Sequence, residues 1–442
     1  MNQPGICRRR VLATLGGTGM AAIAGCSGGD GVSSTTVSGA ATDGATATRA
    51  AAETSRTAAD TPTATEGTDS PGLPAGHDYY VTTGGSADNP GTRAAPFGAI
   101  AEAIQEVAAG ESIYVDSGEY QELLEVGTDG TAEQPIELTG PADAVLRRPS
   151  DQPAAMLVGG DHVHVTGLSI TGLADPSRAE DPEAYADAPL VMVTTKSFDT
   201  YNRGAVIAPH RIGDSGAQLV KFRFCRDAEA GPFRVAGRAG AKWQLSGSGH
   251  PSGEIVYVGT SPSTIEKAPV ESWDRTRNVR VHHVDNAAGH PHGQLVDVKP
   301  GTENVTVEYC TDGGGSHNNK DWEARSIAVR GHAATVRWNR LQNGEGVGIG
   351  VGSGHNNDPE NEVQERAGED NEIYGNEITG FGEESIWFPY DDEGPGQAPE
   401  DQAIYCGNTV DGPADGNPAS ACPADVPSGD GVGHTGGDVP GQ

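Results

Sequence analysis

The chain has 442 residues, with 62 acidic against 29 basic residues and a formal net charge of -33. A surface this acidic repels nucleic acids and anionic membranes, so neither is expected as a partner. Aromatic residues make up 5% and the apolar set 35%, which favours a turn-rich β protein over a large helical core. Only six of the 29 basic residues are lysines. An acid-rich, lysine-poor composition resembles that of halophilic proteins, in which salt screens the repulsion between the acidic groups.

The first 25 residues have the pattern of an export signal. Three consecutive arginines (8–10) precede an apolar stretch (11–24) that is shorter than the roughly 20 residues needed to span a bilayer. The adjacent arginines suggest twin-arginine export, and Ile-Ala-Gly before Cys26 resembles a lipobox, in which the cysteine is lipidated. We expect an extracellular, cell-surface protein anchored to the membrane only through lipid on Cys26; the alternative is a plain secretion signal with an incidental cysteine.

Composition divides the rest of the chain into three parts. Residues 26–76 are rich in Ser, Thr, Ala and Gly and predict a disordered tether. Residues 77–411 carry the β-rich pattern of one folded domain, expected to be a monomer, and residues 412–442 predict a disordered Gly/Pro/Asp-rich tail. An exported protein can form disulfides, so Cys406 and Cys422 can pair, whereas Cys310 is expected as a small buried apolar residue.

The folded part opens with a strand at 79–82 and a helix at 97–109. Apolar residues at 97, 100, 104 and 107 have helical spacing, and Gly110 ends the helix. Short β runs then recur. Their second apolar residues align as a set of anchors, with steps of 26–37 residues from the second anchor onward: Val165, Val281, Val307, Val336, Ile373 and Ile404.

This repeat predicts an all-β fold, a right-handed parallel β-helix (solenoid) with a short N-terminal capping helix. Stacked coils, about 4.8 Å apart, bury one continuous interior that no single coil could bury alone. Asn339 and Asn376 stand three places after their anchors, where amides can form a ladder from coil to coil. The alternative is a β-sandwich, which would have strand steps of about 8–12 residues and hairpin turns.

The segment from YYVTTGG at residue 79 to SIYVDSGEY at 112–120 resembles the opening of secreted right-handed parallel β-helix proteins of the pectate-lyase-like superfamily. The recurring turns with Asn fit the same group, and the resemblance covers residues 77–411. It implies a helix that caps the first coil. The superfamily includes polysaccharide lyases, glycoside hydrolases, epimerases and surface proteins without known catalysis, so the resemblance specifies the fold more than the activity.

Alternation of side chains predicts which residues face outward. With Val296 and Val298 inward, Asp297 and Lys299 face out, and the same pattern places Arg330 beside Lys299 on the next coil. Tyr257 then lies over Asp297, and Trp387 faces outward farther along. Cations that hold carboxylates and rings that pack on sugars predict a site for an acidic polysaccharide.

The segments around Lys299 and Arg330 are similar to the lysine and arginine strands of β-helix alginate and chondroitin lyases. The resemblance implies β-elimination of a uronate, with Lys299 as the base and Arg330 as the acid. Those enzymes place acidic calcium ligands shortly before the lysine, where this chain has His292 and Gln294. Calcium remains an option, with Asp285, Asp297 and Asp312 as available ligands, but no clustered carboxylates single them out.

Alternatives to this site stay open. An outward Lys299–Arg330 pair can be a solvated ion pair on a non-catalytic adhesion solenoid. The histidines at 282, 283, 290 and 292 can bind a metal, or His292 can act as an acid or base. Trp322, in an insertion at 313–326, is a candidate wall for the substrate groove, and residues 185–250 read as an irregular excursion. A glycoside hydrolase is the third hypothesis, although the sequence does not show the paired Asp residues that inverting hydrolases use.

Overall fold

The computed structural model describes residues 72–196, 200–246, 253–259, 276–314, 325–352, 368–388, 398–429 and 431–433. The expected export signal, Cys26 and nearly all of the expected tether lie outside these residues, as does Trp322.

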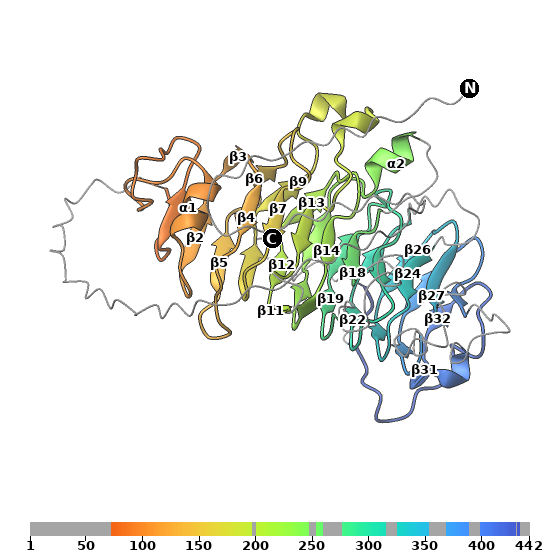
Figure 1. The fold of residues 1–442 in the computed structure, drawn as a ribbon. Coiled ribbons are helices and arrows are strands. Elements are labelled where there is room, and N and C mark those ends of the chain that lie inside the picture. The colour runs from red at the N-terminus through yellow and green to blue at the C-terminus, as the bar shows by residue number, and fades with distance from the viewer. Residues whose placement is uncertain are drawn as a thin grey trace, which may run out of the picture. The chain divides into compact units, whose positions relative to one another are not determined.

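Among the described residues, strands form three long parallel sheets that share one interior (Figure 1). The 11-stranded sheet contains β1 (Tyr79–Val81), β2 (Ser112–Val115), β5 (Ile136–Thr139), β8 (Val163–Thr166), β12 (Val206–Ala208), β16 (Glu229–Ala230), β19 (Arg280–His282), β22 (Thr306–Glu308), β25 (Thr335–Arg337), β28 (Glu372–Tyr374) and β31 (Ile404–Cys406). The 10-stranded sheet contains β3 (Gly118–Gln121), β6 (Ala144–Arg147), β9 (Ser169–Thr171), β13 (Arg211–Gly213), β17 (Phe233–Val235), β20 (Val284–Asn286), β23 (Thr311–Asp312), β26 (Arg340–Gln342), β29 (Glu377–Thr379) and β32 (Thr409–Val410). The nine-stranded sheet contains β4 (Leu124–Val126), β7 (Met156–Val158), β10 (Val191–Val193), β14 (Val220–Phe222), β18 (Val256–Val258), β21 (Val296–Val298), β24 (Arg325–Val329), β27 (Val347–Val351) and β30 (Ile386–Trp387).

Each coil gives one strand to each sheet in turn, as β19, β20 and β21 do, and every paired neighbour is parallel. The chain therefore folds as a right-handed parallel β-helix, and the sandwich alternative is wrong. Val281, Val296, Val298 and Val307 are fully buried in one continuous core, as the alternation of side chains predicted.

The remaining elements are short. A two-stranded sheet pairs β11 (Asn202–Arg203) with β15 (Cys225–Arg226), and α2 spans Ala241–Ser246. The 3₁₀ helices are η1 (Pro176–Arg178), η2 (Pro182–Ala184) and η4 (Pro399–Asp401). No helix in the described residues combines the length and apolarity that a membrane crossing needs.

Helix α1 (Ile100–Glu106) packs over the first coils, although it is shorter than the expected 97–109. Its apolar residues Ile100, Ala103 and Ile104 are buried in the common core. The carboxylate of Glu122 accepts hydrogen bonds from the backbone N–H groups of Ile100 (2.8 Å) and Ala101 (2.9 Å). This contact satisfies two of the donors that every helix N-terminus leaves unpaired.

The strand register corrects one anchor of the predicted repeat. Val165, Val281, Val307, Val336 and Ile373 align as predicted, but Ile373 pairs with Tyr405 rather than with Ile404.

The same column also contains Ile207 and Ala230, so the region 185–250 contributes coils to the β-helix rather than an irregular excursion. The repeat was hidden there because the strands are short and the second of these two anchors is only an alanine.

The predicted asparagine ladder is present and extends to Asn408. The side-chain oxygen of Asn376 accepts hydrogen bonds from the backbone N and the amide of Asn339, both at 3.0 Å. Its own amide donates to the Val336 carbonyl and to Asn408, both at 2.9 Å. All three asparagines are buried, so each rung satisfies backbone groups that water cannot reach.

We expect Asn376→Ala to lower the free energy of unfolding by about 2–5 kcal/mol, because it leaves a buried donor on Asn339 and a buried carbonyl on Val336 unpaired. Urea unfolding measures this loss. The exposed Asn417 gives a matched control, since Asn417→Ala should change stability by less than about 0.5 kcal/mol. Equal effects of the two substitutions would contradict a stabilising role for the asparagine ladder.

Order extends beyond residue 411, where the sequence predicted a disordered tail to begin. Cys406 and Cys422 form a disulfide, and Gly433 N donates to the Trp338 carbonyl at 2.7 Å. Residues 418–429 and 431–433 are thereby held against the outside of the last coils. Cys310 is fully buried and unbridged, as expected.

Candidate functional site

The candidate site lies on the outer side of the nine-stranded sheet. Val296 and Val298 point into the core, so Asp297 and Lys299 project to the other side. The register places one residue per coil in a column there: Lys221, Tyr257, Asp297, Ala328, Gly350 and Trp387. Tyr257 therefore lies over Asp297, and Arg330 follows Val329 beside Lys299, as the alternation predicted.

Lys299 and Arg330 converge on Asp297. The Lys299 Nζ lies 2.5 Å from Asp297 Oδ2, and Arg330 Nη2 lies 2.6 Å from both carboxylate oxygens. Asp297 is 0% exposed, Lys299 7% and Arg330 6%. The two cations are thus neighbours on the outer side of the coil, but they close onto a buried carboxylate rather than pointing into solvent.

Asp297 therefore does not present a free carboxylate to a substrate, as its assignment to substrate binding required. Both of its oxygens are taken by the two cations. The sequence pattern places these three residues on one side of the strand, but it does not show that the side chains bend toward one another. Asp297 instead holds the Lys299 amine and the Arg330 guanidinium in place.

A second buried carboxylate, Glu254, belongs to the same cluster and was not predicted. Its Oε2 accepts a hydrogen bond of 2.9 Å from Gln218 Nε2. Burial, and after it the charge of Asp297, raises the pKa of Glu254 above the ordinary value. Sequence reasoning missed Glu254 because it precedes the alternating run of β18 from which the outward side chains were inferred.

The pKa values of Lys299 and Asp297 are both lowered. Burial, and then the charge of Arg330, lowers the pKa of Lys299, and the opposing attraction of Asp297 and Glu254 does not restore it. Burial would raise the pKa of Asp297, but Arg330 and Lys299 outweigh it and hold that pKa below the ordinary value. A lysine with a lowered pKa gives up its proton more readily than an ordinary lysine, and the amine that results can act as a base.

Tyr257 is not an exposed plate for sugar packing, because only 4% of it is accessible. Its ring lies between two lysines: Lys221 Nζ is 4.4 Å and Lys299 Nζ is 4.7 Å from the ring centroid. The quadrupole of the ring attracts both ammonium groups. Sequence reasoning missed Lys221, although the Val-Lys-Phe of β14 has the same alternation as the Val-Tyr-Val of β18.

At the other end of the column, Trp387 contacts Arg325, which was also not predicted. The guanidinium carbon of Arg325 lies 4.9 Å from the Trp387 ring centroid, and Nη1 donates to the Gly352 carbonyl at 2.9 Å. Gly350 makes this path possible, because a Cβ there would lie 2.3 Å from Arg325 Cδ. Arg325 thus crosses from its own coil to the next ones.

His292, which the sequence analysis offered as a catalytic acid or base, lies outside this cluster. It is fully buried, and its Nε2 lies 3.1 Å from Asp312 Oδ1. Asp312 also accepts hydrogen bonds from Ser326 (2.5 Å) and Asn286 (3.0 Å). Burial would raise the pKa of Asp312, but His292 and these donors lower it. The network therefore ties β20 and β23 of the ten-stranded sheet to β24 of the nine-stranded sheet, away from solvent.

The residues do not fit a calcium or other metal site. Asp297 and Asp312 are bound as described above, and Asp285 pairs with Arg234 at 3.4 Å. His282 has one ring nitrogen 2.7 Å from Glu229 and the other 2.9 Å from His283, away from the His292 network. No group of three or more His, Cys, Asp or Glu in the described ranges is arranged to hold a metal ion.

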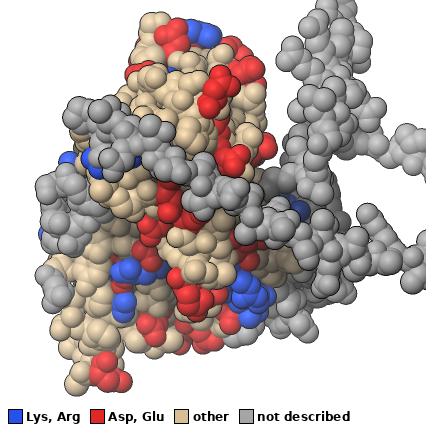
Figure 2. Space-filling model, turned by 90° about the vertical axis from the view of Figure 1, so that its left-hand side faces the viewer, with Lys and Arg blue, Asp and Glu red and all other residues tan. Residues whose placement is uncertain are grey.

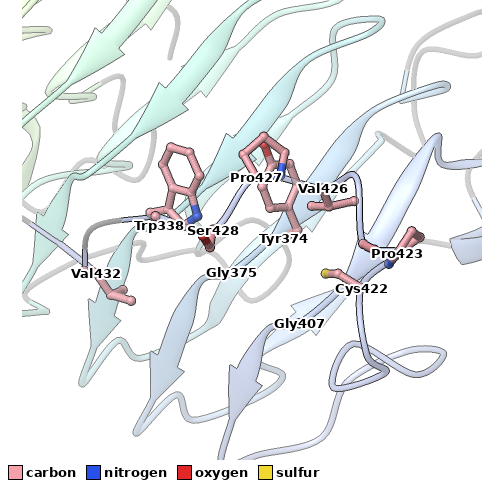
Figure 3. Close-up of a pocket in the computed structure, with 13 residues that line it drawn as sticks. Trp338, Tyr374, Gly375, Gly407, Cys422, Pro423, Val426, Pro427, Ser428 and Val432 are labelled. Carbon is pink, nitrogen blue, oxygen red and sulfur yellow. The ribbon is translucent and has the colours of Figure 1, made fainter.

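A separate cavity of about 500 Å³ lies under the C-terminal segment (Figure 3). Trp338 and Tyr374 line it from the coils, and Pro423, Val426 and Pro427 line it from the segment. None of the described residues that line it is charged, and none is a predicted site residue. An acidic sugar would therefore meet no cation among them.

Charges of both signs lie close together at the candidate site. On the face drawn in Figure 2, acidic side chains are scattered among uncharged ones, and basic side chains form small separate patches. Along the nine-stranded sheet, the cations of Lys299 and Arg330 lie with the buried carboxylates of Asp297 and Glu254.

Comparison with known proteins gives the fold and little more. No protein-family model matches the chain. A Bacillus subtilis (strain 168) protein described as uncharacterized protein YwoF is 42% identical over 60 residues, which is 13% of either chain and so far less than two thirds of that relative.

Three solved structures resemble the chain at low identity. An alginate lyase from Paenibacillus is 18% identical with a TM-score of 0.43, covering 72% of this chain and 96% of that one. A GH136 lacto-N-biosidase from Eubacterium ramulus is 13% identical with a TM-score of 0.48, covering 76% and 60%. A pectate lyase, Pel9A, is 13% identical with a TM-score of 0.45, covering 81% and 84%. Likeness at this level bears on neither the reaction nor the substrate.

Proposed function

We propose that this chain is an exported, cell-surface protein that binds an acidic polysaccharide and cleaves it by β-elimination at a uronate residue. The observation that carries the proposal is the buried Lys299–Asp297–Arg330 cluster on the outer side of the coil, in which the pKa of the lysine is lowered. Export and lipid anchoring rest on the arginines at 8–10, the apolar stretch at 11–24 and Cys26.

The proposed elimination needs a base and a positive charge, and this cluster contains both. The neutral amine of Lys299 takes the proton from the carbon next to the uronate carboxylate, and the freed electron pair forms the double bond. The adjacent carbon–oxygen bond to the next sugar then breaks with its electrons. The leaving oxygen takes the proton back from the Lys299 ammonium, which restores the neutral amine.

Arg330 acts as a fixed positive charge in this scheme rather than as the acid that the resemblance implied. A guanidinium does not give up its proton in proteins, so Arg330 is suited to neutralise the substrate carboxylate and to donate hydrogen bonds. The substrate carboxylate would take the place of Asp297 on one face of the guanidinium. Asp297 stays in the cluster beside Lys299, so the bound carboxylate adds one negative charge there.

Glycoside hydrolysis is the second candidate, and Glu254 is the reason to keep it. Glu254 has a raised pKa and Asp297 a lowered one, and hydrolases use a carboxyl pair of this kind as acid and base. It is the weaker candidate because both oxygens of Asp297 are held by cations. The third candidate is a surface solenoid without catalysis, in which the cluster only stabilises the fold.

One set of incubations separates the three. The purified chain is mixed with alginate, pectate or chondroitin in concentrated salt, and ultraviolet absorbance of unsaturated uronate is followed beside the release of reducing ends. Elimination raises both signals together. Reducing ends without the absorbance would support hydrolysis, and neither signal on any acidic glycan would overturn the proposed activity.

A further inference from the structure

The cavity under the C-terminal segment lies at the corner between the 11-stranded and the 10-stranded sheets, not on the nine-stranded sheet that carries Lys299. Trp338 stands there between β25 and β26, and Gly375 between β28 and β29. We propose that this cavity binds one neutral sugar ring, which gives the protein a glycan contact separate from the Lys299 cluster. The inference goes beyond the proposed elimination and does not depend on it.

The cavity exists because one turn position changes from aromatic residues to glycines along the solenoid. The position has a positive φ on five successive coils. His283, Tyr309 and Trp338 occupy it first, and their rings pack on one another with centroids 5.1 and 5.0 Å apart. Gly375 and Gly407 occupy it on the next two coils. Because neither glycine carries a ring, the space beside Trp338 stays open.

The C-terminal segment covers this space and is held on both sides of it (Figure 3). The disulfide of Cys422 with Cys406 attaches the segment to the last coil, and the Gly433 N–H donates to the Trp338 carbonyl at 2.7 Å. Between these contacts, Gly429 lies so close to the Trp338 ring that a Cβ there would come within 2.7 Å of it. The cavity is therefore formed before a ligand enters, which lowers the cost of binding.

The walls of the cavity suit an uncharged ligand. Charged residues make up 21% of the chain, yet none of the thirteen described residues that line the cavity is charged. An ionic ligand would lose its hydration there without meeting an opposite charge. The volume of about 500 Å³ lies within the range of small-molecule sites.

Polar groups on the wall favour a sugar over a purely apolar molecule. A Cβ on Gly375 would lie 3.0 Å from Trp338 Nε1, so the N–H edge of the indole is directed to the part of the wall that Gly375 forms. No described residue accepts a hydrogen bond from this N–H. The Tyr309 ring and the Arg337 guanidinium, whose carbon lies 4.2 Å from the indole, hold Trp338 in place. Ser428 adds a hydroxyl group, so the wall offers both apolar surface and hydrogen-bonding groups, as a sugar ring requires.

The test follows the indole N–H signal of Trp338 by nuclear magnetic resonance, and Trp338→Phe identifies that signal among the five tryptophans. Glucose, galactose and mannose are each added beside the matching uronate, which differs from the neutral sugar only in its carboxylate. We expect at least one neutral sugar to shift the signal. Its uronate should bind about 10-fold more weakly or worse, because its charge would be buried without a cation.

Two variants with matched controls locate the binding, which calorimetry measures. Ala424→Leu puts a larger side chain into the cavity wall and should weaken binding about 10-fold, whereas Ala419→Leu, at an exposed alanine that does not line the cavity, should bind as the wild type does. Trp338→Phe removes the N–H donor and should weaken binding about 5-fold or more. Trp243→Phe, in α2, should have no effect.

Thermal melting checks that each variant is folded. No shift of the Trp338 signal with any of the three neutral sugars would overturn the inference, as would equal binding of a sugar and its uronate or equal binding by Ala424→Leu and wild type. Cyclohexanol, a ring with one hydroxyl group, is the control for the ligand. A shift as large as that with the sugar would show an apolar cavity without sugar recognition and would also overturn the inference.

Discussion

Lys299→Met is expected to abolish elimination, with a loss of about 10³-fold or more in turnover. A general base contributes about 10²–10⁴-fold, and methionine keeps the shape of the lysine stem without the amine. Asp297 still has Arg330 at 2.6 Å in this variant, so the cluster keeps one ion pair and the fold should persist. Initial rates from the absorbance of the unsaturated product measure the loss.

Lys299→Arg is the sharper version of the same experiment. Arginine keeps the positive charge against Asp297 but stays protonated in proteins, so it cannot act as the base. We expect this variant to fold and to bind the glycan, yet to be as inactive as Lys299→Met. Substantial activity in Lys299→Arg would mean that the site needs a cation at this position and no base.

Asp297→Asn should have the largest effect on stability, about 3–5 kcal/mol. The substitution leaves an amine and a guanidinium, which are 7% and 6% exposed, without their shared carboxylate, and breaking a buried ion pair from one side costs about this much. Asp285→Asn is the matched control, because its ion-pair partner Arg234 is 40% exposed and such pairs are worth about 1 kcal/mol or less. The hydrogen bond that Asp285 accepts from the Ala287 backbone N is one that an asparagine oxygen can keep.

The effect should depend on pH in a definite direction. The pKa of Asp297 is lowered in the folded protein, so its stabilisation is present above the ordinary aspartate pKa and is lost as the pH falls through the lowered value. Urea unfolding should therefore separate wild type from Asp297→Asn most at neutral pH and less in acid. A difference below about 1 kcal/mol at neutral pH would contradict the assigned role.

The fold could be predicted from the sequence because each coil of a β-helix repeats a similar pattern of apolar and turn residues. Alternating apolar residues such as Val296 and Val298 set the inward side of each strand, and Asn339 and Asn376 marked equivalent turns. The same alternation placed Tyr257 over Asp297 correctly. It missed the coil at Ala230, because an alanine carries little of the apolar signal on which the pattern rests.

The site was less predictable, since alternation gives the side of a strand but not the partner of a side chain. Lys299 was placed beside Arg330 correctly, but that Asp297 binds both depends on how the side chains bend. His292 lies near Lys299 in sequence, and the turn before β21 directs it to Asp312 instead. Arg325 was missed because it reaches the site only across the space that Gly350 leaves.

The titration of the Lys299 amine is the most direct test of the reaction proposed for this cluster. Isotope labelling of lysine gives few signals in this chain, and Lys299→Met identifies the one of interest. Because burial and Arg330 lower its pKa, we predict that this amine loses its proton at a lower pH than the other lysines, with elimination rising over the same range. An amine that stays protonated until the other lysines titrate would show a permanent ion pair with Asp297 and would contradict its role as the base.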